Sequence, residues 1–210
     1  RSKRGDQRRV ALILWSKIIV ACIPAAILGK LLDDWMDAHL YNGLVVSLML
    51  ILYGVLFILV ENRNRKTEPQ ITKMWQLNYQ TALYIGMFQV LALIPGTSRS
   101  GVTILGAVLL GCSRAIAAEF SFFVGIPIMF GASLLKFVKF GFRFSNAEIV
   151  YLVLGMLVAF LVSVYSIRFL MSWVKKNDFK VFGYYRIVLG VIVLIWYIMS
   201  TLMGRSMGAA

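Results

Sequence analysis

One arginine and four hydroxyl side chains lie close together in the segment Pro95–Thr103, which reads PGTSRSGVT. The flanking segments Tyr79–Ile94 and Val102–Gly111 are largely apolar and carry no charged residue. Charged and polar side chains at membrane depth are costly, so they normally line a functional site. A helix that begins near Val102 would direct its free backbone N–H groups and its positive end toward this segment. The pattern therefore predicts an anion site, and phosphate is the anion that suits it best.

Arg99 is the strongest candidate for chemistry, because its planar guanidinium can bind two phosphate oxygens at once. The alternative is a structural arginine that is neutralised by a carboxylate or by carbonyl groups. The crowding of hydroxyls in the same segment favours a functional role, since helix capping explains one hydroxyl but not all of them.

Three other polar residues are weaker candidates. Gln89 precedes the turn at Pro95 and could bind a substrate or a hydrated metal, or make an interhelical hydrogen bond. Glu119 is the only acid inside a predicted span. We expect it to form a structural pair with Arg114 or Arg99, and proton transfer or metal ligation is the alternative. His39, the only histidine, is expected to be solvated in an external loop.

The composition indicates an all-α integral membrane protein. Hydrophobic residues make up 60% of the 210 residues, well above the level of soluble domains. A helix that crosses a bilayer core of ~30 Å needs about 17–25 apolar residues. Five runs meet the length requirement and are predicted transmembrane helices: Val10–Leu28, Gly43–Val60, Ala115–Leu135, Ile149–Ile167 and Ile187–Met203.

Cys22 and Cys112 lie in or beside apolar segments, where we expect buried thiols and neither a disulfide nor a metal site.

The net charge of +13 comes from basic residues that lie mostly in the short segments between the apolar runs. This is the positive-inside pattern of membrane proteins, so we expect no nucleic-acid partner. The pattern places the basic N-terminus and the polar loop Glu61–Lys73 in the cytoplasm. The segment Lys30–Asn42 holds three aspartates against one lysine, and we expect it to be an external loop.

The segment Tyr79–Gly111 could be a single span or a re-entrant hairpin that turns at Pro95. The positive-inside count does not separate the two. The length of the second half of the segment separates them, because Val102–Gly111 forms only about 15 Å of helix at 1.5 Å per residue, which is half of a membrane. A single span would also place a proline and two glycines near its centre, where they break a helix. We therefore predict a re-entrant hairpin over 79–111.

The predicted order is two spans, then the hairpin and three further spans. Broken half-helices often occur in inverted repeats whose sites lie at the membrane midplane. We expect one membrane domain over 1–210, in which 1–73 forms the last two spans of a first repeat and 74–210 forms a second repeat. The repeat pattern leads us to expect a further hairpin and one span upstream of Arg1. The chain from Arg1 would then hold half of an active site and have little activity alone.

These residues resemble the undecaprenyl-diphosphate phosphatase family of the bacitracin-resistance type, over nearly all of the chain. The most specific parts are GMFQ (86–89) leading to PGTSRSGVT (95–103), then AAEFSF (117–122) with Pro127, and FGYYR (182–186). The resemblance implies six spans and two re-entrant hairpins in the bacterial plasma (inner) membrane. It implies an enzyme that removes the terminal phosphate of the C55 isoprenoid diphosphate and so recycles the lipid carrier for peptidoglycan synthesis.

The resemblance also implies a divalent metal, Mg²⁺ or Ca²⁺, and it places Ser98, Arg99 and Thr103 at the phosphate. The family's second motif, a glutamate-rich hairpin with a serine and a histidine, does not occur in these 210 residues. We expect that motif and the metal ligands upstream of Arg1, with no metal ligand within 1–210. Arg99 and Ser98 are the predicted catalytic residues. The predicted substrate-binding residues are Gly96, Thr97, Ser100, Gly101, Thr103 and Gln89.

The sequence also bears on two other function classes. Type 2 phosphatidic-acid phosphatases carry a histidine after the arginine in an SRxxxxxH element, and the sequence SRSGVTILG (98–106) has none, which excludes that class. A transporter or flippase for a phosphorylated lipid or a small anion is the alternative, because a broken helix at the midplane suits alternating access equally well. The expected partners are undecaprenyl diphosphate and membrane lipids, and a homo-oligomer is left open.

Overall fold

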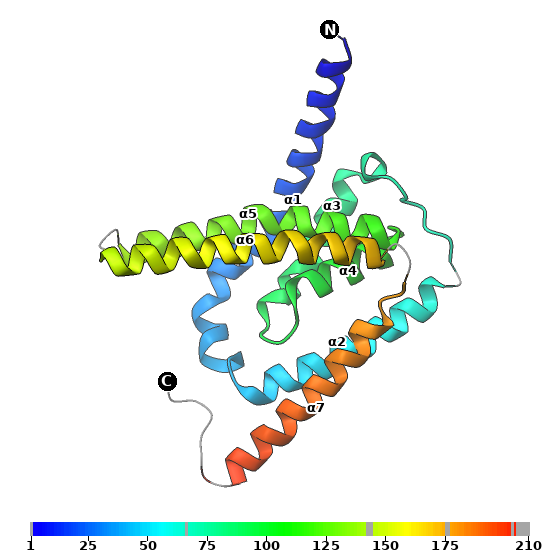
Figure 1. Ribbon diagram of the computed structural model, residues 1–210. Coiled ribbons are helices and arrows are strands. Elements are labelled where there is room, and N and C mark those ends of the chain that lie inside the picture. Colours follow the sequence, from blue (N-terminus) through cyan, green and yellow to red (C-terminus); the bar gives the residue numbers. More distant parts are fainter. Residues whose placement is uncertain (1, 66, 142–144, 175–176, 203, 205–210) are drawn as a thin grey trace.

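The computed structural model describes residues 2–65, 67–141, 145–174, 177–202 and 204. Their regular structure is helical, apart from an isolated backbone bridge between Ile71 and Cys112. The predicted all-α class is therefore confirmed for the described residues. In chain order the helices, with the 3₁₀-helices marked η, are α1 (Ser2–Leu40), α2 (Gly43–Asn64), η1 (Met74–Gln76), α3 (Tyr79–Val90), η2 (Leu91–Leu93), α4 (Arg99–Leu109), α5 (Arg114–Phe140), α6 (Asn146–Val174) and α7 (Lys180–Leu202) (Figure 1).

Five of these helices are long and apolar enough to cross a membrane, judged by length and composition. The segments concerned are Arg8–Leu32, Gly43–Asn64, Arg114–Val138, Ala147–Val174 and Lys180–Leu202. Each of the five predicted spans therefore lies in a helix that could cross a membrane, although Met203, the predicted end of the last one, lies outside the described residues. Helix α7 begins at Lys180 rather than at the predicted Ile187, so Arg186 lies inside a spanning helix.

Two predicted loops are partly helical, and both predictions are wrong for the same reason. The acidic segment that begins at Lys30 is not a loop, because α1 continues through it as far as Leu40. Helix α2 likewise continues past Val60 to Asn64, so Glu61 is helical. Charged residues end an apolar run, but without proline or glycine they do not end a helix.

Helices α2 and α7 lie side by side and cross very closely (Figure 1). A Cβ added at Gly54 would lie 2.8 Å from the backbone oxygen of Gly183, and one at Gly183 would lie 2.7 Å from that of Gly54. Facing glycines allow two membrane helices to approach in this way. The contact fixes α7 against α2 next to the turn that precedes α4.

Helix α4 is short and almost wholly buried, with every residue from Gly101 to Val108 buried. It packs against α2, α3 and α5, and Figure 1 shows it at the centre of the molecule. Its apolar side chains share one core with residues of the neighbouring helices, such as Ile18, Ile85 and Phe120. Because α4 is central, the turn at its N-terminus lies among the helices.

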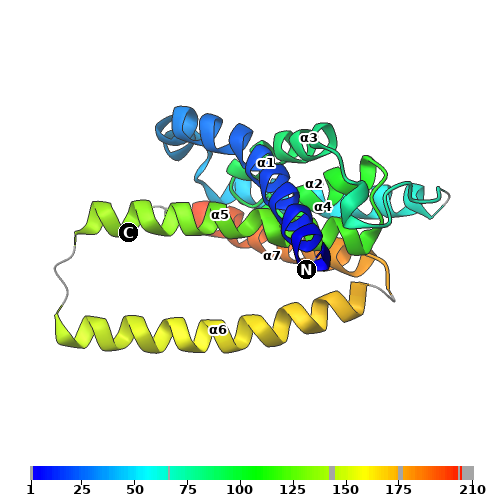
Figure 2. The ribbon, with the colours of Figure 1, turned by 90° about the horizontal axis from the view of Figure 1, so that it is seen from above.

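Helix α6 is the least covered of the spanning helices. It runs beside α5 and away from α1 to α4 (Figure 2), and none of its most apolar 18-residue window is buried. Large apolar side chains such as Val158, Phe160 and Tyr165 are exposed along it. A helix that is apolar all round suits a lipid environment.

Candidate active site

The chain reverses direction between η2 and α4, and two residues with positive φ make this turn. Gly96 has φ 87°, and a Cβ there would lie 2.6 Å from the backbone oxygen of Val46 in α2. Glycine is the residue that fits both the backbone conformation and this contact. Ser98 has φ 66°, which is uncommon for a residue with a side chain and clusters at functional sites. The turn is therefore held tightly against α2.

Helix α4 begins immediately after this turn and directs its first backbone N–H groups toward it. Ser98 is the N-cap, and its hydroxyl accepts a hydrogen bond from the N–H of Gly101 at 3.3 Å. One hydroxyl of the segment thus has the capping role. The remaining free N–H groups and the helix dipole make the turn favourable for an anion.

The Arg99 side chain lies along α5, where a glycine leaves room for it. A Cβ added at Gly125 would lie 2.8 and 2.9 Å from the two terminal guanidinium nitrogens. The Nη2 of Arg99 also donates to the thioether sulfur of Met129, one helical turn further along α5, at 3.5 Å. Within the described residues Arg99 forms no ion pair. The structural alternative, an arginine neutralised by a carboxylate, therefore finds no support in the described part of the chain.

Three further predicted site residues lie on different sides of α4. Ser100 and Gly101 line a cavity together with Ser98. The Thr103 hydroxyl instead faces α5, where it shares a hydrogen bond with the Ser121 hydroxyl at 2.5 Å and donates to backbone oxygens of its own helix. A phosphate contact for Thr103 stays a prediction, and in this geometry its hydroxyl joins α4 to α5.

Gln89 and Thr97 are buried, and their side-chain polar atoms have no hydrogen-bond partner among the residues that the structure describes. Gln89 is 2% exposed and Thr97 is 0% exposed, and neither the Gln89 amide nor the Thr97 hydroxyl is bonded. Such atoms are costly and call for an explanation, such as a bound ligand or water. This geometry is compatible with the predicted substrate-binding role, which stays a prediction for both residues.

Arg186 is a feature of the turn that the sequence analysis missed. It comes from α7, is 9% exposed, and donates from Nη2 to the backbone oxygens of Gly96 at 2.7 Å and Thr97 at 3.0 Å. It therefore joins the turn to α7. In the sequence Arg186 has apolar residues on both sides, and this pattern could have identified it. It was not assigned to the site because the predicted span begins at Ile187, one residue later.

The cavity that opens beside the turn has a volume of about 240 Å³. Its polar lining comes from the turn, the first turn of α4 and α7, and its apolar lining comes from α2, α4, α5, α6 and α7. The residues that line it include Phe57, Ser98, Ser100, Ala118, Phe182 and Arg186. The turn thus lies next to a space with mostly apolar walls.

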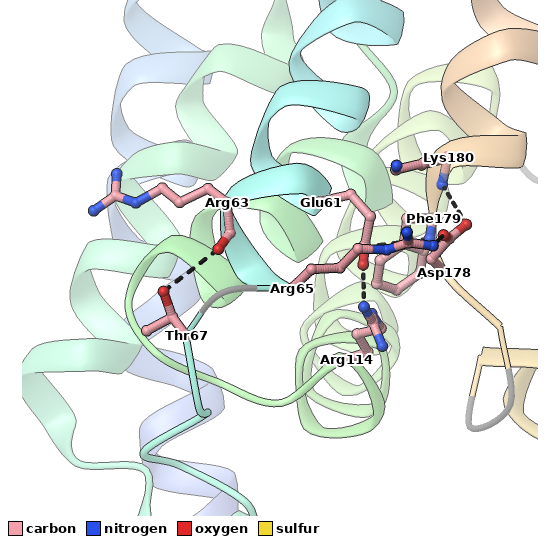
Figure 3. Close-up of polar contacts among 8 residues, drawn as sticks. All are labelled: Glu61, Arg63, Arg65, Thr67, Arg114, Asp178, Phe179 and Lys180. Atoms are coloured by element: carbon pink, nitrogen blue, oxygen red, sulfur yellow. Dashed lines mark hydrogen bonds and ion pairs between the residues drawn. The ribbon is translucent and has the colours of Figure 1, made fainter.

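A second polar cluster joins the ends of three helices (Figure 3). Glu61, in the last turn of α2, is 2% exposed and accepts a hydrogen bond from the guanidinium of Arg114 at the start of α5. Its other carboxylate oxygen accepts from the backbone N–H of Phe179, just before α7, at 3.4 Å. Beside them, Arg65 pairs with Asp178 at 2.5 Å. The cluster ties the end of α2 to the starts of α5 and α7.

This cluster corrects the prediction for Glu119. Arg114 pairs with Glu61, and Glu119 is half-buried and forms no hydrogen bond or ion pair within the part of the chain that the structure describes. Glu61 was assigned to a polar loop because it follows the apolar run directly. Its actual place in the last turn of α2 brings it to Arg114 across the bundle.

His39 and the two cysteines were also assigned environments from the sequence. His39 is exposed, as expected, but it lies in the last turn of α1, where its ring stacks on that of Trp35. Cys22 is half-buried and Cys112 is buried, and both are free thiols.

Comparison with known proteins gives a consistent result. The family model described as "Bacitracin resistance protein BacA" matches residues 1–192. An undecaprenyl-diphosphatase from Enterococcus faecalis is 54% identical over 94% of this chain and 73% of its own length, and a second one from the same species is 60% identical over 87% and 66%. An undecaprenyl-diphosphatase from Acetivibrio thermocellus is 58% identical over 88% of this chain and 68% of its own length. The chain thus spans about two thirds to three quarters of the length of these relatives.

Proposed function

The chain belongs to the family described as bacitracin resistance protein BacA, and on this premise we propose that it is an undecaprenyl-diphosphate phosphatase. The reaction converts undecaprenyl diphosphate to undecaprenyl phosphate and phosphate, and so recycles the lipid carrier for peptidoglycan synthesis. The single observation that supports this function best is Arg99, the first residue of α4, whose guanidinium forms no ion pair within the described residues. Relatives named for this activity match the chain over most of its length.

The chemistry requires that negative charge on the attacked phosphate be neutralised, and the turn is built for this. Arg99 and the N–H groups at the start of α4 act as fixed donors, which stabilise charge that develops in the transition state. Such donors are worth most where water is excluded, and Thr97 and Gly101, on either side of Ser98–Ser100, are buried. Ser98 caps the helix, and its positive φ orients the turn between α2 and α5.

Phosphate release in detergent separates the phosphatase from a transporter or flippase. A hydrolase releases inorganic phosphate from undecaprenyl diphosphate in micelles, where there are no two compartments to transport between. We expect the purified full-length protein to release one phosphate for each undecaprenyl phosphate formed. Intact substrate after incubation, together with movement of the lipid or of phosphate in vesicles, would favour the transporter.

We expect Gly125→Val to lower kcat/KM by roughly tenfold or more, because the added side chain displaces the Arg99 guanidinium from its position on α5. The fold should be retained, since the atoms that must move are the end of a flexible side chain. The measurement is phosphate release alongside thermal unfolding in detergent.

Gly131→Val is the matched control on the same helix, because nothing lies within 4 Å of a Cβ at that position. We expect it to leave kcat/KM unchanged. In an Arg99→Ala background, Gly125→Val should have no further effect on activity. An equal effect of Gly125→Val with and without the guanidinium would show that Gly125 acts through packing and not through Arg99.

We propose that 79–111 is a re-entrant hairpin whose two ends lie on the cytoplasmic side. Helix α4 has eleven residues, about 16 Å at 1.5 Å per residue, which is too short to cross the membrane. The Glu61–Arg114 pair joins the end of α2 to the residue at the start of α5. The backbone N–H groups of Gln70 and Ile71 also donate to the oxygen of Gly111, at 2.9 and 3.0 Å. These contacts support a chain that enters and leaves on the same side.

The hairpin predicts that cysteines at Glu68 and Ser113 react with an impermeant thiol reagent from the same side of oriented vesicles. A cysteine at His39 should react from the opposite side. Burial raises the pKa of the Cys112 thiol to about 11, so it stays unlabelled near neutral pH, and Cys22 is replaced by alanine. If Glu68→Cys and Ser113→Cys were labelled from opposite sides, the segment would be a single span.

We also propose that hydrolysis depends on a divalent metal, Mg²⁺ or Ca²⁺. These ions take oxygen ligands, chiefly carboxylates. The described residues contain no group of three or more His, Cys, Asp or Glu side chains that could hold a metal ion, and the unbonded side-chain oxygens at the turn, of Gln89 and Thr97, are neutral. The described residues by themselves therefore do not fit a metal site. The roles of Arg99 and α4 do not depend on the metal.

We also propose a membrane location and a repeat architecture for the protein. Five apolar helices and bacterial relatives support a multi-pass protein of the bacterial plasma membrane. We further propose that residues 1–73 and 74–210 belong to two inverted repeats of one membrane domain, because the hairpin is followed by three spans.

A further inference from the structure

A buried cation lines the cavity beside the turn. Arg186 lines this cavity and is 9% exposed. Its Nη2 donates to two backbone oxygens, but these carbonyl groups carry no net charge, and its buried Nε has no hydrogen-bond partner in the described part of the chain. Within the described residues Arg186 forms no ion pair. A buried cation in this condition is costly, which points to an anionic ligand.

The rest of the cavity is apolar, so the ligand has an apolar part next to its charge. Two serines, Tyr185 and one guanidinium in a mostly apolar lining fix the orientation of such a ligand. The volume of about 240 Å³ is below the roughly 300–1,000 Å³ of sites that enclose a whole ligand. The cavity therefore holds only the part next to the charge. Its apolar lining includes Phe57, Ala118, Leu170, Val174 and Phe182.

Arg99 does not line this cavity. Its guanidinium lies on α5 beside Gly125 and Met129, whereas Ser98 and Ser100, its neighbours in sequence, do line the cavity. The turn thus has two cationic positions, one supplied by Arg99 on the α5 side and one supplied by α7. A diphosphate has two phosphates to be bound.

We propose that the Arg186 cavity binds the phosphate that carries the isoprenoid chain, together with the first isoprene units, while Arg99 binds the terminal phosphate. This assignment rests on the proposed phosphatase function. After hydrolysis the same cavity holds the lipid product. The ligand class of the cavity is therefore an isoprenoid phosphate monoester, for which farnesyl monophosphate is a soluble probe.

Equilibrium binding of farnesyl monophosphate to the full-length protein in detergent tests the proposal without turnover. Ala118→Leu fills the apolar part of the cavity and is expected to weaken farnesyl monophosphate binding about tenfold or more, with inorganic phosphate binding unchanged. Arg186→Gln removes the charge and is expected to weaken farnesyl monophosphate binding by about tenfold or more. Farnesol, which has no phosphate, should bind equally well to the wild type and to Arg186→Gln.

Arg168→Gln is the matched control, because it removes an exposed arginine of α6 that is not part of the cavity. Leu170→Trp, at a partly exposed position that lines the cavity, replaces Ala118→Leu if that variant does not fold. Unchanged farnesyl monophosphate binding in Arg186→Gln and in a folded cavity-filling variant would overturn the proposal. Phosphate release is measured on the same preparations. If the wild type hydrolyses undecaprenyl diphosphate and the variants bind farnesyl monophosphate as tightly as the wild type, the cavity assignment alone is rejected. If the wild type does not hydrolyse undecaprenyl diphosphate, the proposed phosphatase function is rejected.

Discussion

Arg99→Ala is expected to abolish phosphate release from undecaprenyl diphosphate, with a loss in kcat of about 10²–10³, the effect of removing one fixed donor from a transition state. The loss should be large because Arg99 forms no ion pair within the described residues and its site lies beside the buried helix α4. Arg99→Lys should recover little activity, since an ammonium group lacks the planar fork that binds two phosphate oxygens. The measurement is phosphate release by purified full-length variants in detergent.

The control for Arg99→Ala is Arg168→Ala, which removes an exposed arginine from α6. We expect this control to retain wild-type turnover, and both variants should unfold at the wild-type temperature. Near-normal turnover of a folded Arg99→Ala protein would remove Arg99 from the site. The anion would then have to bind through the helix N-terminus and Arg186 alone.

Glu61→Ala should lower the free energy of unfolding by about 2–3 kcal/mol, the cost of leaving donors without their buried acceptor when the remaining charge, on Arg114, is 32% exposed. Glu61 is 2% exposed, and its loss leaves the Arg114 guanidinium and the N–H of Phe179 without their acceptor. Because this carboxylate joins α2 to the starts of α5 and α7, the helices around the turn should separate more easily. Denaturant unfolding in mixed micelles, followed by tryptophan fluorescence, measures the change.

The neighbouring pair of Arg65 and Asp178 is the matched comparison, because the Arg65 side chain is 57% exposed. Arg65→Gln should cost no more than about 1 kcal/mol, as is usual for exposed ion pairs. A loss for Glu61→Ala as small as that for Arg65→Gln would mean that the buried cluster does not hold the helix ends together.

The apolar helices were predictable from sequence because they depend on a strong local signal, and a second local signal led to the prediction of an anion site. Apolar runs that are long enough to cross a membrane specify helices with little competition. The polar segment around Arg99 stands out because its flanks carry no charge. Helix ends were less predictable, since a change from apolar to charged residues marks the membrane surface and does not end the helix. This explains why α1 extends to Leu40 and why Glu61 belongs to α2.

The partners of the charged residues could not be read from sequence, because they come from distant parts of the chain. Glu61 and Arg114 are 53 residues apart, and Arg186 reaches the backbone oxygens of the turn across 89 and 90 residues. Sequence proximity favoured Glu119 as the partner of Arg114, and this prediction was wrong. Nothing in the sequence indicates that the Arg99 guanidinium lies against Gly125.

The most direct test of the central claim is the structure of the full-length protein with a non-hydrolysable farnesyl diphosphate analogue, whose bridging oxygen is replaced by a methylene group. The account predicts that the Arg99 guanidinium, in its position beside Gly125 on α5, binds two oxygens of the terminal phosphate at about 2.7–3.2 Å. The same phosphate should accept hydrogen bonds from N–H groups at the start of α4. A terminal phosphate bound elsewhere, without contact to Arg99, would contradict the account.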